Sequence, residues 1–245
     1  MNVCTRSVQL TPAGVAFKTH AQQLVDNYHQ MKHDLSAFSI PHQKLSIGYI
    51  PVITQYNIAN SIGQFKQSVP DLQLEFQEGE HNEIVDLLLT HQIKFAFLRG
   101  ELLDKTLFNL TPLAQDELVL IVPKKHPLAK KKYVSLMEVQ DESFISLSVN
   151  SGVYHLFLSA CERNNFTPHI SCLNSRIENI IGLVSAGMGI SPLMKRSIEC
   201  FNRQNIEIVL LKETIYSQLC LAHLANKPLT KLEQEFKNYI IQNSR

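Results

Sequence analysis

Polar side chains stand at the ends of several stretches that are predicted to be β-strands, where small ligands commonly bind. Arg99 follows the apolar run 95–98, and a guanidinium group there can hold both oxygens of a carboxylate. Similar polar residues precede two predicted helices of the second half: Ser148, Asn150, Ser151, Asn174 and Ser175. Hydroxyl, amide and free backbone N–H groups at such positions suit a small carboxylate or similar anion. The chemistry that these residues predict is therefore anion binding.

Each of these residues also has a purely structural interpretation. Arg99 can form a surface salt bridge, for instance with Glu101, and such a pair contributes little to stability. Serine and asparagine in front of a helix are common N-caps, a role that is compatible with ligand binding. His81 opens a predicted helix, and it is either a ligand contact or a solvated cap.

No arrangement for catalysis or metal binding accompanies them. The sequence contains no G-x-S-x-G, H-E-x-x-H or C-x-x-C motif, so it lacks the spacings that nucleophilic or metal-assisted chemistry requires. His126 adjoins Pro127 within a lysine-rich stretch, which is typical of a solvated turn. We therefore expect a protein that is not an enzyme and has no metal or cofactor.

Composition and cysteine usage favour a cytoplasmic protein. The five cysteines are odd in number and scattered, which indicates reduced thiols: Cys4, Cys161, Cys172, Cys200 and Cys220. The N-terminus has no apolar segment of a signal peptide, and no run is long enough to cross a membrane. With 23 Lys+Arg against 22 Asp+Glu, the net charge of +1 provides no basic field for sequence-independent DNA binding.

The candidate residues are positioned by two similar sets of elements. Between residues 45 and 100, three short runs rich in β-branched and aromatic residues alternate with two helix-length segments, 56–67 and 81–90. This pattern predicts a βαβαβ unit with a parallel sheet, whose ligand site lies beyond the carboxyl ends of the strands. Thr54, Gln55, His81 and Arg99 would all lie at that edge.

The second half repeats the pattern. Strands are expected at 143–148, 169–174 and 189–194, separated by helices at 152–164 and 176–186. Further strands are expected at 107–113, 118–122, 206–211 and 216–224, and a final amphipathic helix at 229–241. Two α/β lobes with a cleft between them result.

A long helix is expected before the first lobe. Thr11 can cap it and Pro12 suits its first position, and it continues to about Phe38. Apolar residues recur within it every 3.5 residues on average: Phe17, Ala21, Leu24, Tyr28, Met31, Leu35 and Phe38. Such a narrow seam on a mostly polar helix favours a dimeric coiled coil over packing on its own domain.

Several of these motifs resemble LysR-type transcriptional regulators. The segment from Arg6 to Gly14 is similar to R-x-V-x-L-T-x-A-G, the end of the family's winged helix-turn-helix. G-Y-I-P at 48–51, the F-x4-P of 65–70 and F-A-F-L-R at 95–99 resemble its effector-binding domain. The most specific match is the segment from Leu183 to Leu193, similar to the family's L-V-a-a-G-x-G-I-x-x-L.

The resemblance implies an α/β fold of two Rossmann-like subdomains, periplasmic-binding-protein-like of type 2, joined by two crossover strands and preceded by a linker helix. The implied divisions are a wing remnant with the dimerisation helix at 1–40, subdomain I at 44–117 plus 218–245, and subdomain II at 118–217. The implied function is the effector-binding and oligomerisation portion of a regulator, a dimer or tetramer that senses a small anionic metabolite in the cleft. Most of the DNA-binding head would precede Arg6, a remnant DNA contact, so we expect DNA binding only with a complete head.

The resemblance also adds residues and doubts to the candidate site. Val52 stands where members of the family commonly have Ser or Thr contacting the effector, and His91 and Lys94 replace a usual Gly and Asp. The complete candidate effector set is Val52, Thr54, Gln55, His81, Arg99, Ser148, Asn150, Ser151, Asn174 and Ser175. The alternatives are a cytoplasmic solute-binding protein of the same fold, or a redox sensor that uses Cys161 and Cys172 as one branch of the family does.

Overall fold

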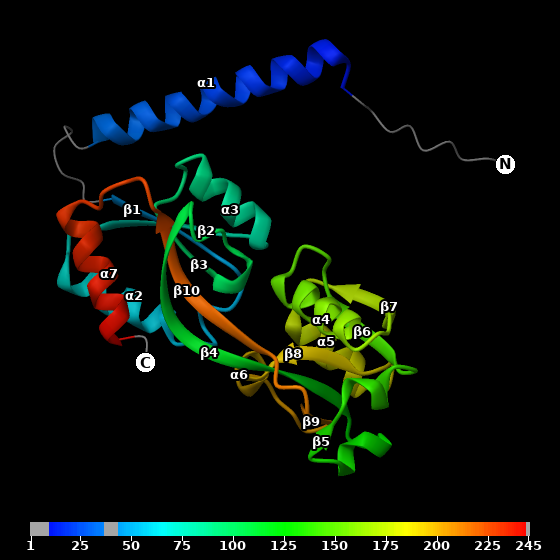
Figure 1. Cartoon of the computed structure of the whole chain (residues 1–245). Coiled ribbons are helices and arrows are strands. Elements are labelled where there is room, and N and C mark those ends of the chain that lie inside the picture. Colours follow the sequence, from blue (N-terminus) through cyan, green and yellow to red (C-terminus); the bar gives the residue numbers. More distant parts are fainter. Residues whose placement is uncertain (1–9, 37–43, 244–245) are drawn as a thin grey trace.

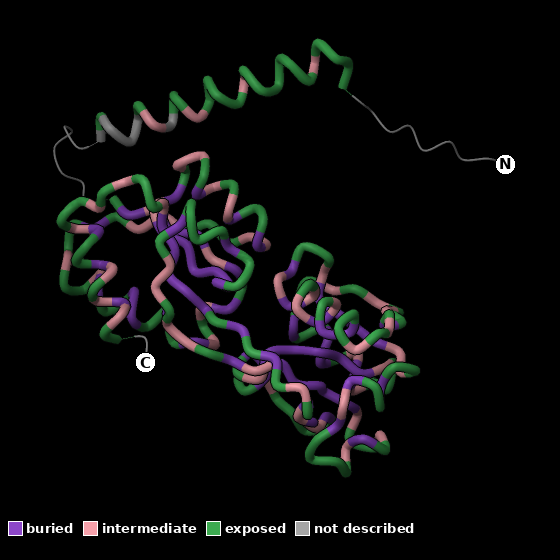
Figure 2. Tube along the Cα trace, in the orientation of Figure 1, coloured by how far each residue is buried: buried purple, intermediate pink, exposed green. Residues whose placement is uncertain are grey.

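The computed structural model describes residues 10–36 and 44–243, which form a long helix and two α/β lobes (Figure 1). The helix, α1, spans Pro12–Ser36. Its start is capped as expected, because the backbone N–H of Gly14 donates to Oγ1 of Thr11 over 3.1 Å. Most of α1 is exposed in this single chain (Figure 2).

The first lobe is built on three parallel strands in the order β2-β1-β3. Its sheet lies between α3 on one side and α2 with α7 on the other (Figure 1), as right-handed crossovers require. The rings of Phe65 in α2 and Phe236 in α7 are 5.2 Å apart. The elements match the predicted ones closely: β1 Lys44–Tyr49, α2 Ile58–Ser68, β2 Gln73–Glu78, α3 His81–Leu89, β3 Phe95–Arg99 and α7 Lys231–Asn243.

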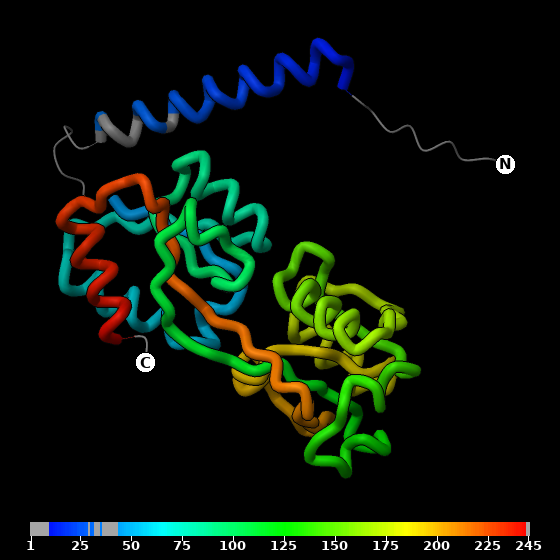
Figure 3. Tube along the Cα trace, viewed as in Figure 1, coloured from blue at the N-terminus to red at the C-terminus, as the bar shows by residue number. Residues whose placement is uncertain are grey.

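Two antiparallel strands connect the lobes. They are β4, Phe108–Pro123, and β10, Tyr216–Leu224, and Figure 3 shows the C-terminal β10 beside the much earlier β4. The sequence predicted separate strands at 107–113 and 118–122, and this division is wrong. The polar residues 115–117 look like a break, but β4 continues through them because β10 pairs with it there.

The second lobe differs from the first in its sheet. The expected third strand, β8, pairs with β4, whereas β6 and β7 form a separate parallel pair. An isolated β-bridge between Phe144 and Ile190 links the two sheets. The second lobe consists of β5 Tyr133–Val134, β6 Ser143–Leu147, α4 Gly152–Arg163, β7 His169–Asn174, α5 Ile177–Ser185, β8 Ser191–Met194, α6 Lys195–Glu199 and β9 Ile206–Leu211, with the 3-10 turns η2 Pro127–Lys130 and η3 Leu136–Val139. A further 3-10 turn, η1 Gly100–Leu102, follows β3 in the first lobe.

Each lobe has a core of its own. One core contains Phe95, Phe97 and Phe236, and the other contains Phe144 and Phe157, all fully buried. The burial of these aromatic rings, together with the aliphatic residues around them, stabilises each lobe through the hydrophobic effect. Among the residues that the structure describes, no helix is long and apolar enough to cross a membrane.

Two local predictions also concern the second lobe. Gly187 has φ 82°, which confirms that it ends a helix in the left-handed conformation that glycine adopts without steric cost. His126 precedes the turn η2, where its Nδ1 accepts the backbone N–H of Leu128 over 3.3 Å, and its Nε2 lies 3.4 Å from Glu142. The predicted turn is thus confirmed.

Candidate functional site

A cleft of about 650 Å³ lies between the two lobes. The first lobe lines it with the ends of β1, β2 and β3, and the second lobe with the starts of α4 and α5 and the β8–α6 junction. The candidate residues that line it are Val52, Thr54, Gln55, His81, Arg99, Ser151 and Ser175. Those outside its lining are Ser148, Asn150 and Asn174.

Arg99 is the most deeply placed charge in the cleft. It is only 2% exposed, and its Nη2 donates to the hydroxyl of Tyr56 over 2.9 Å. Its Nε and Nη1 are buried and have no hydrogen-bond partner among the described residues. Buried N–H groups of a cation are costly to leave unpaired, so these two nitrogens are ready for an anion.

The alternative interpretation of Arg99 as a surface salt bridge is wrong, because its side chain is buried. The carboxylate of Glu101 is engaged elsewhere. It accepts a hydrogen bond from the hydroxyl of Ser217 and another from the backbone N–H of Gln218, the latter over 3.1 Å.

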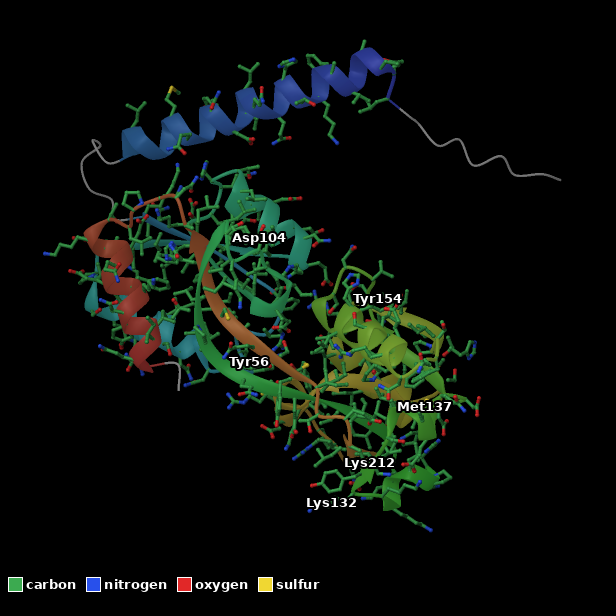
Figure 4. All side chains as sticks on the ribbon, in the orientation of Figure 1. Tyr56, Asp104, Lys132, Met137, Tyr154 and Lys212 are labelled. Atoms are coloured by element: carbon green, nitrogen blue, oxygen red, sulfur yellow. The ribbon has the colours of Figure 1, made fainter. Side chains whose placement is uncertain are left out.

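Tyr56 and Asp116 support Arg99, and sequence reasoning identified neither. The hydroxyl of Tyr56 accepts from Arg99 and donates to Asp116. Figure 4 labels Tyr56 on the part of the first lobe that faces the second. Burial raises the pKa of Tyr56 to about 12, with Arg99 lowering it and Asp116 raising it. Tyr56 therefore keeps its proton and connects the two charged groups.

Asp116 extends this network to the second lobe. Its carboxylate accepts the backbone N–H of Arg196, at the start of α6, over 3.2 Å. It also accepts the N–H of Glu117 over 2.8 Å. A signal for Asp116 existed in the sequence, since an aspartate next to a buried strand needs partners. Its partner Tyr56, 60 residues away, had no comparable signal.

His81 opens α3 but is not a solvated cap, because it is only 6% exposed. Burial lowers the pKa of His81, against the raising effect of a backbone hydrogen bond with Leu102. Its Nδ1 is buried without a partner among the described residues. His81 is therefore a cleft residue whose burial favours the neutral form and whose Nδ1 is left without a partner.

The two lobes also touch at the edge of the cleft. Oγ of Ser148 donates to Oε1 of Glu80 over 3.1 Å, which joins the end of β6 to the residue before α3. Ser148 thus forms a contact between the two lobes and does not line the cleft.

The start of α4 approaches Arg99 closely. Ser151 caps this helix, since its Oγ accepts the N–H of Val153 over 3.3 Å. A Cβ atom on Gly152 would lie 3.6 Å from Cγ of Arg99 and 2.7 Å from Leu102. The positive end of α4 therefore lies beside the aliphatic part of the Arg99 side chain, and both the helix start and the arginine favour an anion.

The remaining candidates have structural roles or lie apart. Asn174 accepts the N–H of Arg176 over 2.9 Å before α5, and Asn150 is exposed outside the cleft. Val52 is buried and supplies only apolar surface. Thr54 and Gln55, which follow it, provide the polar groups of that loop.

Two of the departures from the family pattern, His91 and Lys94, lie outside the cleft lining. Nζ of Lys94 lies 3.2 Å from Oε2 of Glu233 and so ties α7 to the first lobe. His91 has φ 59°, the left-handed conformation that a glycine would adopt there.

The cysteines give little support to a redox sensor. Cys161 is fully buried, and burial raises the pKa of its thiol to about 12. Since the thiolate is the reactive form, such a thiol reacts poorly. Cys172 is partly exposed in β7.

A two-lobed α/β fold with a cleft between the lobes defines an effector-binding domain of the periplasmic-binding-protein-like type. Comparison with known families matches residues 40–245 to the LysR substrate binding domain. The chain therefore belongs to the LysR-type transcriptional regulators, which are regulators and not enzymes.

Individual relatives agree with this assignment. The transcriptional dual regulator GltC of Bacillus subtilis (strain 168) is 23% identical over 245 residues, which cover 97% of this chain and 80% of GltC. The effector-binding domain of QuiR in complex with shikimate is 25% identical, with a TM-score of 0.74 over 83% of this chain and 98% of that one. The CcmR regulatory domain of Synechocystis PCC6803 in complex with 2-PG has the same fold, with 22% identity and a TM-score of 0.75 over 82% and 97% of the chains.

Proposed function

We propose that this chain senses a small anionic metabolite in the cleft between its lobes. The observation that carries the proposal is Arg99, a buried cation that lines the cleft with two unpartnered nitrogens. The start of α4, which packs against the Arg99 side chain, adds the positive end of a helix dipole. The complex of QuiR with shikimate, a carboxylic acid, supports the same class of ligand.

Binding would act through lobe closure. The lobes already meet through Ser148 and Glu80, and through Asp116 and Arg196. A ligand that contacts Arg99 of one lobe and Ser151 of the other would bind the closed arrangement more tightly than the open one. This difference in affinity would shift the lobes toward closure. Closure would then move the linker helices of an oligomer relative to one another, in the cytoplasm where such a regulator acts.

We also propose that α1 forms the dimer interface. Its seam is exposed in the single chain, with exposed fractions of 73% for Phe17, 69% for Leu24 and 58% for Leu35. Tyr28 and Met31 are exposed as well, and Ala21 is intermediate. A stripe of this kind is costly in water and needs a second helix. Phe38 and the proposed DNA contact Arg6 lie outside the described residues.

The test is ligand binding with an Arg99→Gln variant. A thermal-shift screen of small carboxylates identifies a ligand, since one at a hundred times its Kd stabilises by about 2.7 kcal/mol. Calorimetry should then show binding to Arg99→Gln weakened by about 1.5 to 3 kcal/mol, as for hydrogen bonds to charged groups. Arg163→Gln, at the far end of α4, is the control and should bind normally. Equal affinity of Arg99→Gln and wild type would place the ligand elsewhere.

A further inference from the structure

We propose that the effector is a zwitterion, with its carboxylate on Arg99 and a protonated amine at the other end facing the glutamates of the first lobe. This inference rests on the proposed anion site at Arg99 and adds a second, cation-binding half to the same cleft.

The charge of the cleft lining motivates the inference. Its carboxylates outnumber its guanidinium groups, although an anion site alone would favour the opposite balance. The acidic side chains of the lining are Glu78, Glu80, Glu83 and Glu178, and the basic ones are Arg99 and Arg176. His81 adds no positive charge at neutral pH, because burial lowers its pKa.

The acidic groups lack cationic partners. Within the described part of the chain, none of the four glutamates forms a salt bridge. Glu83 accepts the backbone N–H of Glu80 over 2.9 Å, and Glu80 accepts the hydroxyl of Ser148. Burial raises the pKa of Glu80, and its proximity to Glu83 adds to this rise. A bound ammonium group would relieve this uncompensated charge.

In the first lobe, the two kinds of charge stand at the ends of different strands. Glu78 ends β2 and Arg99 ends β3, and β1 runs between these strands. Since neighbouring strands are about 4.8 Å apart, the two strand ends are separated by roughly 10 Å. Glu80 and Glu83 belong to the start of α3, which follows β2. The first-lobe side of the cleft is therefore bipolar, with a buried positive charge at the end of β3 and an exposed negative charge at the end of β2.

This bipolar lining distinguishes among acids. A dicarboxylate would place its second charge against Glu78 and Glu80, where like charges repel. A simple monocarboxylate would satisfy Arg99 and leave the glutamates as they are. A molecule with a carboxylate and an ammonium group several bonds apart would pair with both ends of the cleft.

The experiment is calorimetric titration of the full chain with the straight-chain ω-amino acids from glycine to 6-aminohexanoate. Each is compared with the monocarboxylate and the dicarboxylate of equal carbon number. We expect at least one amino acid to bind at least tenfold more tightly than both of its matched acids. If the matched acids bind as tightly as every amino acid, the zwitterion is wrong while the anion site stands. If no compound in the series binds, the zwitterion is again rejected, and the screen of other carboxylates decides the anion site.

A variant separates the two halves of the site. Glu78→Gln with Glu80→Gln should reduce the preference for the amino acid to about threefold or less, with binding of the matched monocarboxylate unchanged or tighter. Glu162→Gln, on α4 and outside the cleft lining, should keep the full preference. The single Glu78→Gln change, at an exposed position, should also reduce this preference, and it leaves the residues at the start of α3 unaltered. A preference that survives both glutamine variants would overturn the inference.

Discussion

Arg99 shows how this protein keeps a charged residue almost completely buried. Its charge is balanced by Asp116 through the hydroxyl of Tyr56, and its planar group lies 5.3 Å from the centre of the Tyr56 ring. This arrangement uses one nitrogen of the guanidinium group and leaves two for a ligand. Because the buried guanidinium group is paired on one side, the protein can fold around it, and the unpaired side can still bind a ligand.

We therefore predict that Tyr56→Phe destabilises the protein. The change removes one hydroxyl but leaves two buried charged groups short of a hydrogen bond, which costs about 1.5 to 3 kcal/mol. Urea unfolding followed by circular dichroism measures the loss. Tyr133→Phe is the control, because Tyr133 is 46% exposed, and surface changes of this kind stay within about 0.5 kcal/mol. Equal unfolding midpoints for the two variants would show that the hydroxyl is dispensable.

At the level of elements, α7 is the piece of chain that returns to complete the first lobe. Phe236 and Ile240 on its apolar face are fully buried, as the sequence predicted. Polar contacts fix its position as well. Glu233 pairs with Lys94, and Nζ of Lys237 lies 3.3 Å from Nε2 of His223 in β10. Because an ammonium group only donates, Nε2 accepts and Nδ1 carries the proton toward the carbonyl of Leu224.

This contact predicts a loss of stability in mild acid. Burial and the charge of Lys237 lower the pKa of His223, so the folded protein keeps it neutral, whereas the unfolded chain takes up a proton near pH 6.5. The stability that depends on a neutral His223 is fully present above that pH. It decreases as the pH drops from there toward the lowered pKa of the folded protein. Urea unfolding at pH 7.5 and 5.5 should show a smaller acid-induced loss for His223→Gln than for wild type. Identical losses would mean that this histidine does not contribute.

At the scale of the whole molecule, two lobes share strands but keep separate cores. The cores lie within residues 45–108 with 219–240, and within 118–215. This separation supports the predicted subdomain boundaries of 44–117 with 218–245 and of 118–217, which remain a proposal. Within residues 44–243, β4 and β10 are the strands that pass between the lobes. A hinge of two strands permits the lobes to open and close around a ligand.

The exposed seam of α1 predicts self-association of the whole chain. Leu24→Asp with Leu35→Asp places charges in the seam, where a paired helix would have to bury them. Sedimentation should therefore show a dimer or larger assembly for wild type and a smaller mass for the variant. Gln23→Asp with Asn27→Asp adds the same charge at exposed polar positions of α1 and should leave the mass unchanged. A wild-type chain that sediments as a monomer would refute the interface.

The sequence by itself determined the local elements and part of the site. Helices and strands of the first lobe follow from side-chain periodicity, and the left-handed Gly187 follows from its place after an apolar helix. Arg99 and Ser151 were found because they stand at the ends of such elements. These features depend on interactions between neighbours along the chain, which a local pattern records.

Only the tertiary structure decided how distant segments meet. It made β4 continuous, paired β8 with β4, and brought Tyr56 to Asp116 and Glu80 to Ser148. Gly189 is a further case, since a Cβ atom there would lie 2.4 Å from the carbonyl oxygen of Ser143. Each of these contacts joins residues 40 or more positions apart in the numbering. Their geometry depends on how the two cores pack, and no periodicity in a short window contains that information.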